Sequence, residues 1–169
     1  MESSIDSSPS LVIDPKDGSV HIDGFELVID TGLTQATALV GLSRFYVSTL
    51  DMKTGYEWLK FRGVKFGGER ASFALCFYVG KLTEIRLGAS SPNEKMTGRW
   101  PSSEEMDENV AFLRQELRRQ LHRPFWTGEE RFEWGDVWAK IDVRGGLPSA
   151  GLRYGPRIPR ITIPASFGK

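Results

Sequence analysis

The amphipathic segment over residues 103–122 constrains the fold of this chain more than any other feature. Ser102 and Glu105 form a capping box, in which the two side chains satisfy free backbone amides at the start of a helix. Acidic side chains crowd its first turns and arginines its last, which suits the helix dipole. We therefore expect one long helix, ended by Pro124, whose apolar stripe must be buried against another element. The stripe consists of Met106, Val110, Leu113, Leu117 and Leu121.

The residues before this helix favour β-strands joined by tight turns. Asp23-Gly24 stands between two apolar runs, which is a strong signal for a hairpin. Residues 71–79 are apolar on both faces, as in the centre of a sheet. Gly80-Lys81 then turns the chain into a strand over 82–87. In that strand the residues expected to face inward are Thr83, Ile85 and Leu87.

The rest of the pattern completes an α+β fold. A short helix over 35–41 is expected, capped by Thr34. After the long helix a strand pattern over 132–143 slips in phase at Gly135-Asp136, which indicates a β-bulge. An edge strand over 160–163 is bracketed by prolines. Strands, short helix, strands, long helix and strands in this order predict a mostly antiparallel sheet, or sheets, with both helices packed on a face.

Length and composition indicate one core. The chain has 169 residues, 40% of them hydrophobic, which is enough for a core without a metal or a disulfide. We expect a flexible serine-rich tail at residues 1–10 and a single domain over 11–169. A helix followed by strands occurs twice, so a tandem repeat with halves at 11–88 and 102–164 is an open alternative.

Charge and cysteine content narrow the choice of partner and compartment. Lys+Arg and Asp+Glu both number 22, and no basic patch is evident, so we expect no nucleic-acid partner. No apolar run is long enough to span a membrane, and the acidic start over 1–6 is unlike a secretory signal. Cys76 is the single cysteine, so no disulfide forms within the chain. Together these features favour the cytoplasm.

The motifs of common enzymes are absent from the sequence. Gly80-Lys81 lacks the first glycine and the hydroxyl residue of a phosphate loop, and no dinucleotide fingerprint occurs. Cys76 and two distant histidines, His21 and His122, do not make a zinc site. We therefore expect no cofactor and no metal, and we name no catalytic residue. Carboxylate pairs leave no spacing signature, so an acid–base site of Asp, Glu or Tyr stays an alternative.

The segment over 132–146 is the main candidate for a functional surface. If the odd-numbered residues from Val137 to Val143 face the core, their neighbours share the opposite face. Large aromatic and charged side chains together are typical of protein-binding hot spots. A competing interpretation is structural, with Trp138 packed beneath the long helix and Asp142 paired with Arg144. The predicted protein-binding residues, including three that would extend this surface from an earlier strand run, are Trp138, Lys140, Asp142, Arg144, Trp58, Tyr46 and Arg62.

Three turn motifs carry a resemblance to known proteins. They are Val20-His21-Ile22-Asp23-Gly24, Phe77-Tyr78-Val79-Gly80-Lys81-Leu82, and Trp134-Gly135-Asp136-Val137-Trp138 running on to Arg144-Gly145-Gly146. With them, most of residues 11–155 resemble small uncharacterised bacterial cytosolic proteins, some of which are similar to immunity proteins of toxin systems. The resemblance implies a toxin as partner and brings no catalytic residue. The element order is also similar to the tandem fold of β-lactamase-inhibitor proteins.

The sequence thus predicts a cytoplasmic α+β protein that docks to another protein. The leading hypothesis is an immunity-type inhibitor that occludes the site of a toxin. The first alternative is an enzyme with an Asp, Glu or Tyr acid–base site, which a pocket of converging carboxylates would favour. The second is a small-ligand-binding module, with aromatic residues around a cavity between helix and sheet. The oligomeric state stays open.

Overall fold

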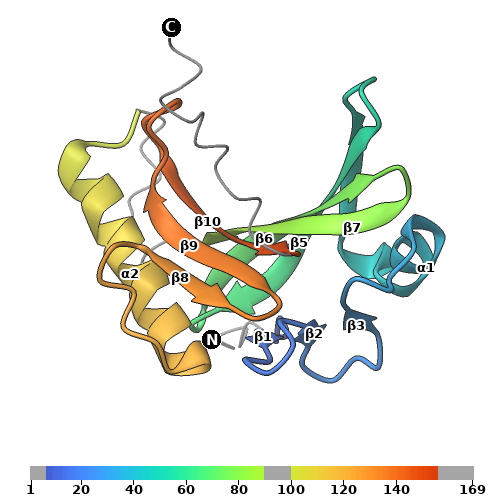
Figure 1. Cartoon of the computed structure of the whole chain (residues 1–169), viewed down its shortest axis with the longest axis horizontal. Helices are drawn as coiled ribbons and strands as arrows, with labels where there is room; N and C mark the ends of the chain where they lie inside the picture. The colour runs from blue at the N-terminus through green and yellow to red at the C-terminus, as the bar shows by residue number, and fades with distance from the viewer. Residues whose placement is uncertain (1–6, 90–99, 156–169) are drawn as a thin grey trace, which may run out of the picture.

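The computed structural model describes residues 7–89 and 100–155, and it confirms the expected α+β class (Figure 1). A three-stranded sheet has the order β1-β2-β3, and a seven-stranded sheet has the order β4-β5-β6-β7-β10-β9-β8. All neighbouring strands in both sheets are antiparallel. The elements are β1 (Leu11–Ile13), β2 (Val20–Ile22), β3 (Val28–Ile29), α1 (Gln35–Gly41), η1 (Ser43–Phe45), β4 (Tyr46–Asp51), β5 (Tyr56–Phe66), β6 (Glu69–Tyr78), β7 (Lys81–Ala89), α2 (Ser103–Leu121), β8 (Glu129–Phe132), β9 (Gly135–Ile141) and β10 (Pro148–Tyr154).

The large sheet consists of two meanders, β4–β7 and β8–β10, joined where β7 pairs with β10. Strand pairing places one row of buried side chains across five strands, and these define the inner face of the sheet. The row is Leu59, Leu75, Ile85, Leu152 and Val137. The alternate residues define the outer face, where the neighbouring row is Trp58, Cys76, Glu84, Arg153 and Asp136.

The long helix covers the inner face, as its apolar stripe requires. The Ser102 hydroxyl accepts a hydrogen bond from the Glu105 amide at 3.1 Å, which confirms the helix start. Leu113, Leu117 and Leu121 are buried in one core with the inner-face residues. Helix α1 contributes Ala38 to the same core. In Figure 1 the two helices lie at opposite sides of the molecule.

The small sheet and the described part of the predicted tail pack against the end of β5. The Pro9 carbonyl accepts a hydrogen bond from the Lys65 amide at 2.9 Å, and Ser10 forms a bridge with Lys65. Residues 7–10 therefore include backbone that is attached to the sheet. The rest of the predicted tail, over 1–6, and the expected edge strand over 160–163 lie outside the described residues.

The strand expected over 132–143 is a hairpin. Phe132 of β8 pairs with Gly135 of β9, so Glu133 and Trp134 form the turn, and β9 ends at Ile141. The predicted bulge at Gly135-Asp136 is therefore wrong, because the slip in phase comes from reversal of the chain.

The inward position expected for Thr83 is also wrong. Pairing moves from Phe77 with Leu82 to Cys76 with Glu84, which leaves Thr83 as the extra residue of a bulge. Leu82 is buried in the core in its place. This change of phase puts Glu84 on the outer face.

A single amide side chain ties the small sheet to the long helix. The Gln120 side-chain oxygen accepts a hydrogen bond from the Ile13 amide at 2.8 Å, and its nitrogen donates to Glu116 at 2.8 Å. We expect Gln120→Leu to lower the free energy of unfolding by about 1–3 kcal/mol, because it leaves the Ile13 amide without this partner. Gln115→Leu, at an exposed position of the same helix, is the control and changes it by less than about 0.5 kcal/mol. Denaturant unfolding measures both variants. Equal effects of the two substitutions would show that the hydrogen bond between Gln120 and the Ile13 amide does not stabilise the fold.

Stability also depends on pH through the buried Glu116. Burial raises the pKa of this carboxyl, but hydrogen bonds from Arg119 and Gln120 outweigh it and hold the pKa below its usual value. Its stabilising contribution is therefore complete above the unfolded pKa and is lost as the pH falls through the folded one. When the pH is lowered from about 7 to about 3, we expect the free energy of unfolding to fall less in Glu116→Gln than in the unmodified chain. Glu108→Gln, at an exposed position of the same helix, is the matched control for removal of one carboxylate, and denaturant unfolding across this pH range measures both variants.

Candidate protein-docking face

The outer face of the large sheet carries bulky side chains beside very small ones. Next to the row of Trp58 and Glu84 runs a second row of paired residues. Its members are Lys60, Ala74, Arg86, Gly151 and Trp138. Because the residues on β6 and β10 in this row are small, long side chains from β7 and β9 have room to lie across those strands.

An alternating array of five side chains results, and we call it the Trp–Arg array: Trp58, Arg86, Glu84, Arg153 and Trp138. The Arg86 guanidinium lies 5.1 Å from the ring centre of Trp58, and that of Arg153 lies 5.3 Å from that of Trp138. Both arginines bind the carboxylate of Glu84 between them. The Arg86 Nε donates to Glu84 Oε2 at 3.1 Å, and the Arg153 Nη2 donates to Oε1 at 3.0 Å.

The array is fixed from below. Glu84 is only 7% exposed, yet both of its oxygens have charged donors. Trp138 is 8% exposed, and its Nε1 donates to the Ser149 hydroxyl at 3.0 Å. A Cβ atom on Gly151 would lie 2.8 Å from the Trp138 ring, so the ring rests directly on that strand. Cation–π contacts and charged hydrogen bonds therefore hold the two guanidinium groups in place at the surface.

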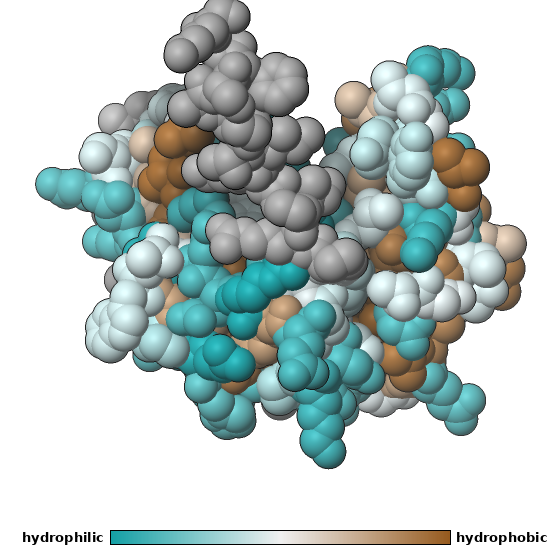
Figure 2. Space-filling model, viewed as in Figure 1, coloured by the Kyte–Doolittle hydropathy of each residue, from teal (hydrophilic) through white to brown (hydrophobic). Residues whose placement is uncertain are grey.

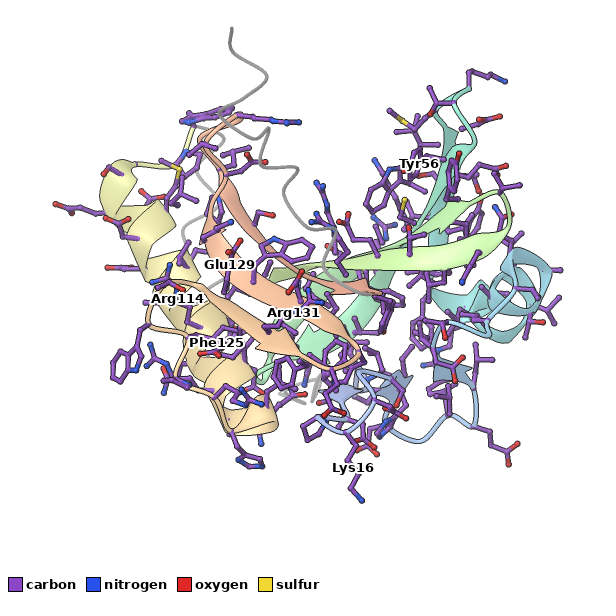
Figure 3. All side chains as sticks on the ribbon, viewed as in Figure 1. Lys16, Tyr56, Arg114, Phe125, Glu129 and Arg131 are labelled. Carbon is purple, nitrogen blue, oxygen red and sulfur yellow. The ribbon has the colours of Figure 1, made fainter. Side chains whose placement is uncertain are left out.

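A cluster of exposed apolar side chains adjoins the array, and we call it the apolar patch: Leu50, Met52, Tyr56, Tyr78 and Val79. The rings of Tyr56 and Tyr78 have centres 4.5 Å apart. Figure 2 shows apolar surface on the side of the molecule that β4 to β7 and α1 form, and Figure 3 places Tyr56 across the face from Glu129 and Arg131 of β8. Exposed apolar clusters of this kind mark sites of association.

A groove of about 430 Å³ connects the patch to the array. Met52, Tyr56 and Trp58 line one side, and Glu84 and Arg153 line the other. Glu84 supplies the carboxylate among the described lining residues, and both of its oxygens are engaged. Burial raises the pKa of the Cys76 thiol on the floor of the groove, so this cysteine stays protonated at neutral pH. The groove therefore suits an apolar segment with a charged group better than a proton-transfer reaction.

The tip of the β6–β7 hairpin carries a residue in a strained conformation. Val79 and Gly80 have φ angles of 46° and 79°, so both central residues of the turn lie in the left-handed region. Glycine and asparagine fit such a turn, whereas a β-branched residue is strained there by about 1–3 kcal/mol. Val79 is also 77% exposed. An exposed apolar residue kept at this cost is a candidate for contact with a partner.

The structure divides the predicted site residues among three places. Trp58, Trp138 and Lys140 share the outer face, with Lys140 bound to Glu129. Trp138 does not pack beneath the long helix, because it lies on the opposite face from α2. Tyr46 pairs with Phe61, and the two rings contact each other at 6.1 Å, so Tyr46 lies on the inner face.

The remaining predicted residues lie toward the other end of the strands. Arg62 borders a second hollow of about 930 Å³, together with Gly88 and Leu147. Asp142 and Arg144 lie beyond the end of β9 in a turn, so the expected strand face does not extend to them. The Asp142 carboxylate accepts a hydrogen bond from the Arg144 amide at 2.9 Å.

The residues that sequence reasoning missed are those whose neighbours come from distant strands. Glu84, Arg86 and Arg153 belong to this group, and so do the members of the apolar patch. The alternation of Glu84 and Arg86 with buried Ile85 was a visible signal for an outer face. Within the described residues, His, Cys, Asp and Glu side chains form no group of three that could hold a metal ion. No described helix is long and apolar enough to cross a membrane.

Comparisons with known proteins show the class of fold. No family model and no curated protein matches the sequence. The chain is similar to one chain of a solved structure described as Rhs1-CT in complex with cognate immunity protein RhsI1. The similarity has a TM-score of 0.53 at 14% sequence identity, and it covers 85% of this chain and 86% of that chain. At this identity the likeness shows a shared fold.

Proposed function

We propose that this protein is an immunity-type inhibitor that binds a toxin through the outer face of its large sheet. The apolar patch joined to the Trp–Arg array carries the proposal, because it combines exposed aromatic residues with fixed charged groups. The fold similarity adds support, since the neighbour is a chain from the complex of Rhs1-CT with its cognate immunity protein RhsI1. Whichever of its two proteins the matched chain is, that chain has a surface that docks to the other.

The mechanism we propose is steric occlusion. Trp58 and Trp138 lie on strands separated by three others, so the face between them spans roughly 19 Å of sheet. We propose that the docked toxin covers the apolar patch as well as the array, because standard protein interfaces cover about 800 Å² on each partner. A toxin held there would have its site covered without any reaction. We place this action in the cytoplasm, as the sequence favours.

A co-expression experiment tests the proposal. Each open reading frame next to the gene is tested as a candidate toxin: it is expressed with and without the chain, and bacterial growth is followed. We expect the chain to restore the growth of bacteria that make the toxin. In bacteria without the toxin, the chain should leave growth unchanged. If the chain alone stops growth, or if no protection occurs although the two proteins are both made, the proposal is wrong.

Replacement of the strained valine sharpens this experiment. Val79→Asn suits the turn better and should raise the free energy of unfolding by about 0.5–1 kcal/mol, while loss of the apolar contact weakens binding to the toxin about 30-fold. A residue with a purely structural role would not give opposite signs in the two measurements. Val143→Asn is the matched control, because Val143 is 98% exposed in the turn beyond β9. Calorimetric titration should give that variant unchanged affinity.

A further inference from the structure

The chain is neutral overall, but the outer face of the large sheet is not. From Tyr56 to Arg62 on β5, and on β7 to β10, acidic side chains on this face are Glu84, Asp136 and Glu129. The basic side chains are more numerous: Lys60, Arg62, Lys81, Arg86, Arg153, Lys140 and Arg131. A surface with an excess of one sign attracts a partner of the opposite sign.

The acidic groups on this face are already neutralised. Asp136 is paired with Arg131 at 2.8 Å, and Glu129 is paired with Lys140. Glu84 is shared by two arginines, so one positive charge there remains in excess. Lys60 and Arg62 have no acidic partner among residues 7–89 and 100–155.

The two arginines keep donors available for a ligand. Arg86 uses its Nε on Glu84, and Arg153 uses Nε and Nη2. Both η nitrogens of Arg86 and Nη1 of Arg153 therefore have no acceptor among the described residues. The Arg86 side chain is 51% exposed and that of Arg153 is 60% exposed. An incoming carboxylate can bind these groups without displacing Glu84.

We propose that the toxin segment that enters the groove is acidic, with carboxylates that bind Arg86 and Arg153 and apolar neighbours that cover Met52 and Tyr56. This inference rests on the proposed docking role of the outer face. Single-stranded nucleic acid is the other anionic partner to consider, but it needs free aromatic ring faces for base stacking. Here Trp138 is buried, and guanidinium groups already lie over both Trp58 and Trp138. These contacts favour an acidic polypeptide.

Titration with an oligo-glutamate peptide tests the inference without any toxin. Tryptophan fluorescence reports binding, because Trp58 and Trp138 lie in the array. We expect saturable binding that weakens with added salt, since ions screen charges over about 10 Å at 0.1 M. An oligo-lysine peptide of the same length should not bind. Equal binding of both peptides, absence of saturable binding, or tighter binding of an oligothymidylate would overturn the inference.

Charge variants give the expected signs. Arg86→Gln and Arg153→Gln should each weaken oligo-glutamate binding about tenfold, since each removes one charge-assisted contact. Glu84→Gln should tighten it about fivefold, because it removes a negative charge beside the ligand. Lys60→Gln, at an exposed side chain, should weaken it without any risk to folding. A Glu84→Gln variant that binds more weakly would count against the inference.

Lys16→Gln is the matched control, because it removes one positive charge at an exposed position far from the groove (Figure 3). Its affinity for oligo-glutamate should be unchanged, and circular dichroism confirms that each variant is folded. Because the peptide titration needs no toxin, its failure leaves the growth experiment intact. Conversely, loss of protection with retained peptide binding would refute the immunity role and keep the inference that the groove binds an acidic segment.

Discussion

Phe61→Ala is expected to be among the most destabilising single substitutions in this chain. Phe61 is buried in β5, its ring stacks on that of Phe73 with centres 4.9 Å apart, and the ring of Tyr46 meets it edge-on. Truncation removes the transfer free energy of the ring and leaves a cavity, so the free energy of unfolding should fall by about 3–5 kcal/mol. For a chain of this length the melting temperature should fall by roughly 10 °C.

A smaller loss of volume separates the effect of the cavity from the effect of the lost ring contacts at this position. Phe61→Leu should cost less than about 1.5 kcal/mol, because it fills most of the same space. Denaturant unfolding and thermal unfolding measure both variants. If Phe61→Leu destabilised the chain as much as Phe61→Ala, the ring contacts with Phe73 and Tyr46 would matter more than the filled volume.

Gly151→Ala is expected to affect both the fold and the docking face. A Cβ atom there would lie 2.4 Å from the Ile85 carbonyl oxygen and 2.8 Å from the Trp138 ring. Either β10 moves from β7 or Trp138 leaves its place, so the free energy of unfolding should fall by about 2–3 kcal/mol. Since Arg153 lies over that ring, its cation–π contact should weaken as well.

Gly145→Ala is the matched control for this substitution. Gly145 lies in the turn beyond β9, and a Cβ atom there would meet nothing within 4 Å. It should change the free energy of unfolding by less than about 0.5 kcal/mol. Equal effects of the two glycine substitutions in denaturant unfolding would show that the close approach of Gly151 to Trp138 does not contribute to stability.

Local signals explain how much of the fold could be predicted. The helix start at Ser102 depends on residues within one turn of it, and the apolar stripe repeats along a single element. The alternation around Leu75 is likewise a property of one strand. These patterns follow from backbone geometry alone, and so the α+β class and the positions of α2 and β6 were accessible from the sequence.

Tertiary contacts explain what was missed around β8 and β9. Trp134 is an unusual turn residue, and its ring stacks on Phe132 with centres 4.8 Å apart. Its Nε1 also donates to the Pro15 carbonyl at 3.0 Å, a contact between residues far apart in the chain. The hairpin is stabilised by packing of this side chain and not by turn propensity. Such packing cannot be predicted from the neighbouring residues in the sequence.

The candidate site was predictable only in part, for the same reason. Trp58 and Trp138 could be placed on outward positions by alternation within their own strands. The array also needs Arg153 beside Glu84, which depends on the register of β7 with β10 and on the bulge at Thr83. Overall neutrality likewise gave no sign of the basic outer face, because composition averages over all surfaces of the chain.

The two edges of the large sheet differ in what they offer to another strand. On one side β8 has four residues, and three of them are charged, which discourages strand addition. On the other side β4 has six exposed residues and a single charge at Asp51. Of these two edges of the large sheet, β4 is therefore the one better suited to pair with another strand. If two copies paired through β4 about a twofold axis, both β4 edges would be occupied and the charged β8 would lie at each end of the joined sheet. Such a sheet would stop at a dimer and would not extend into a fibre.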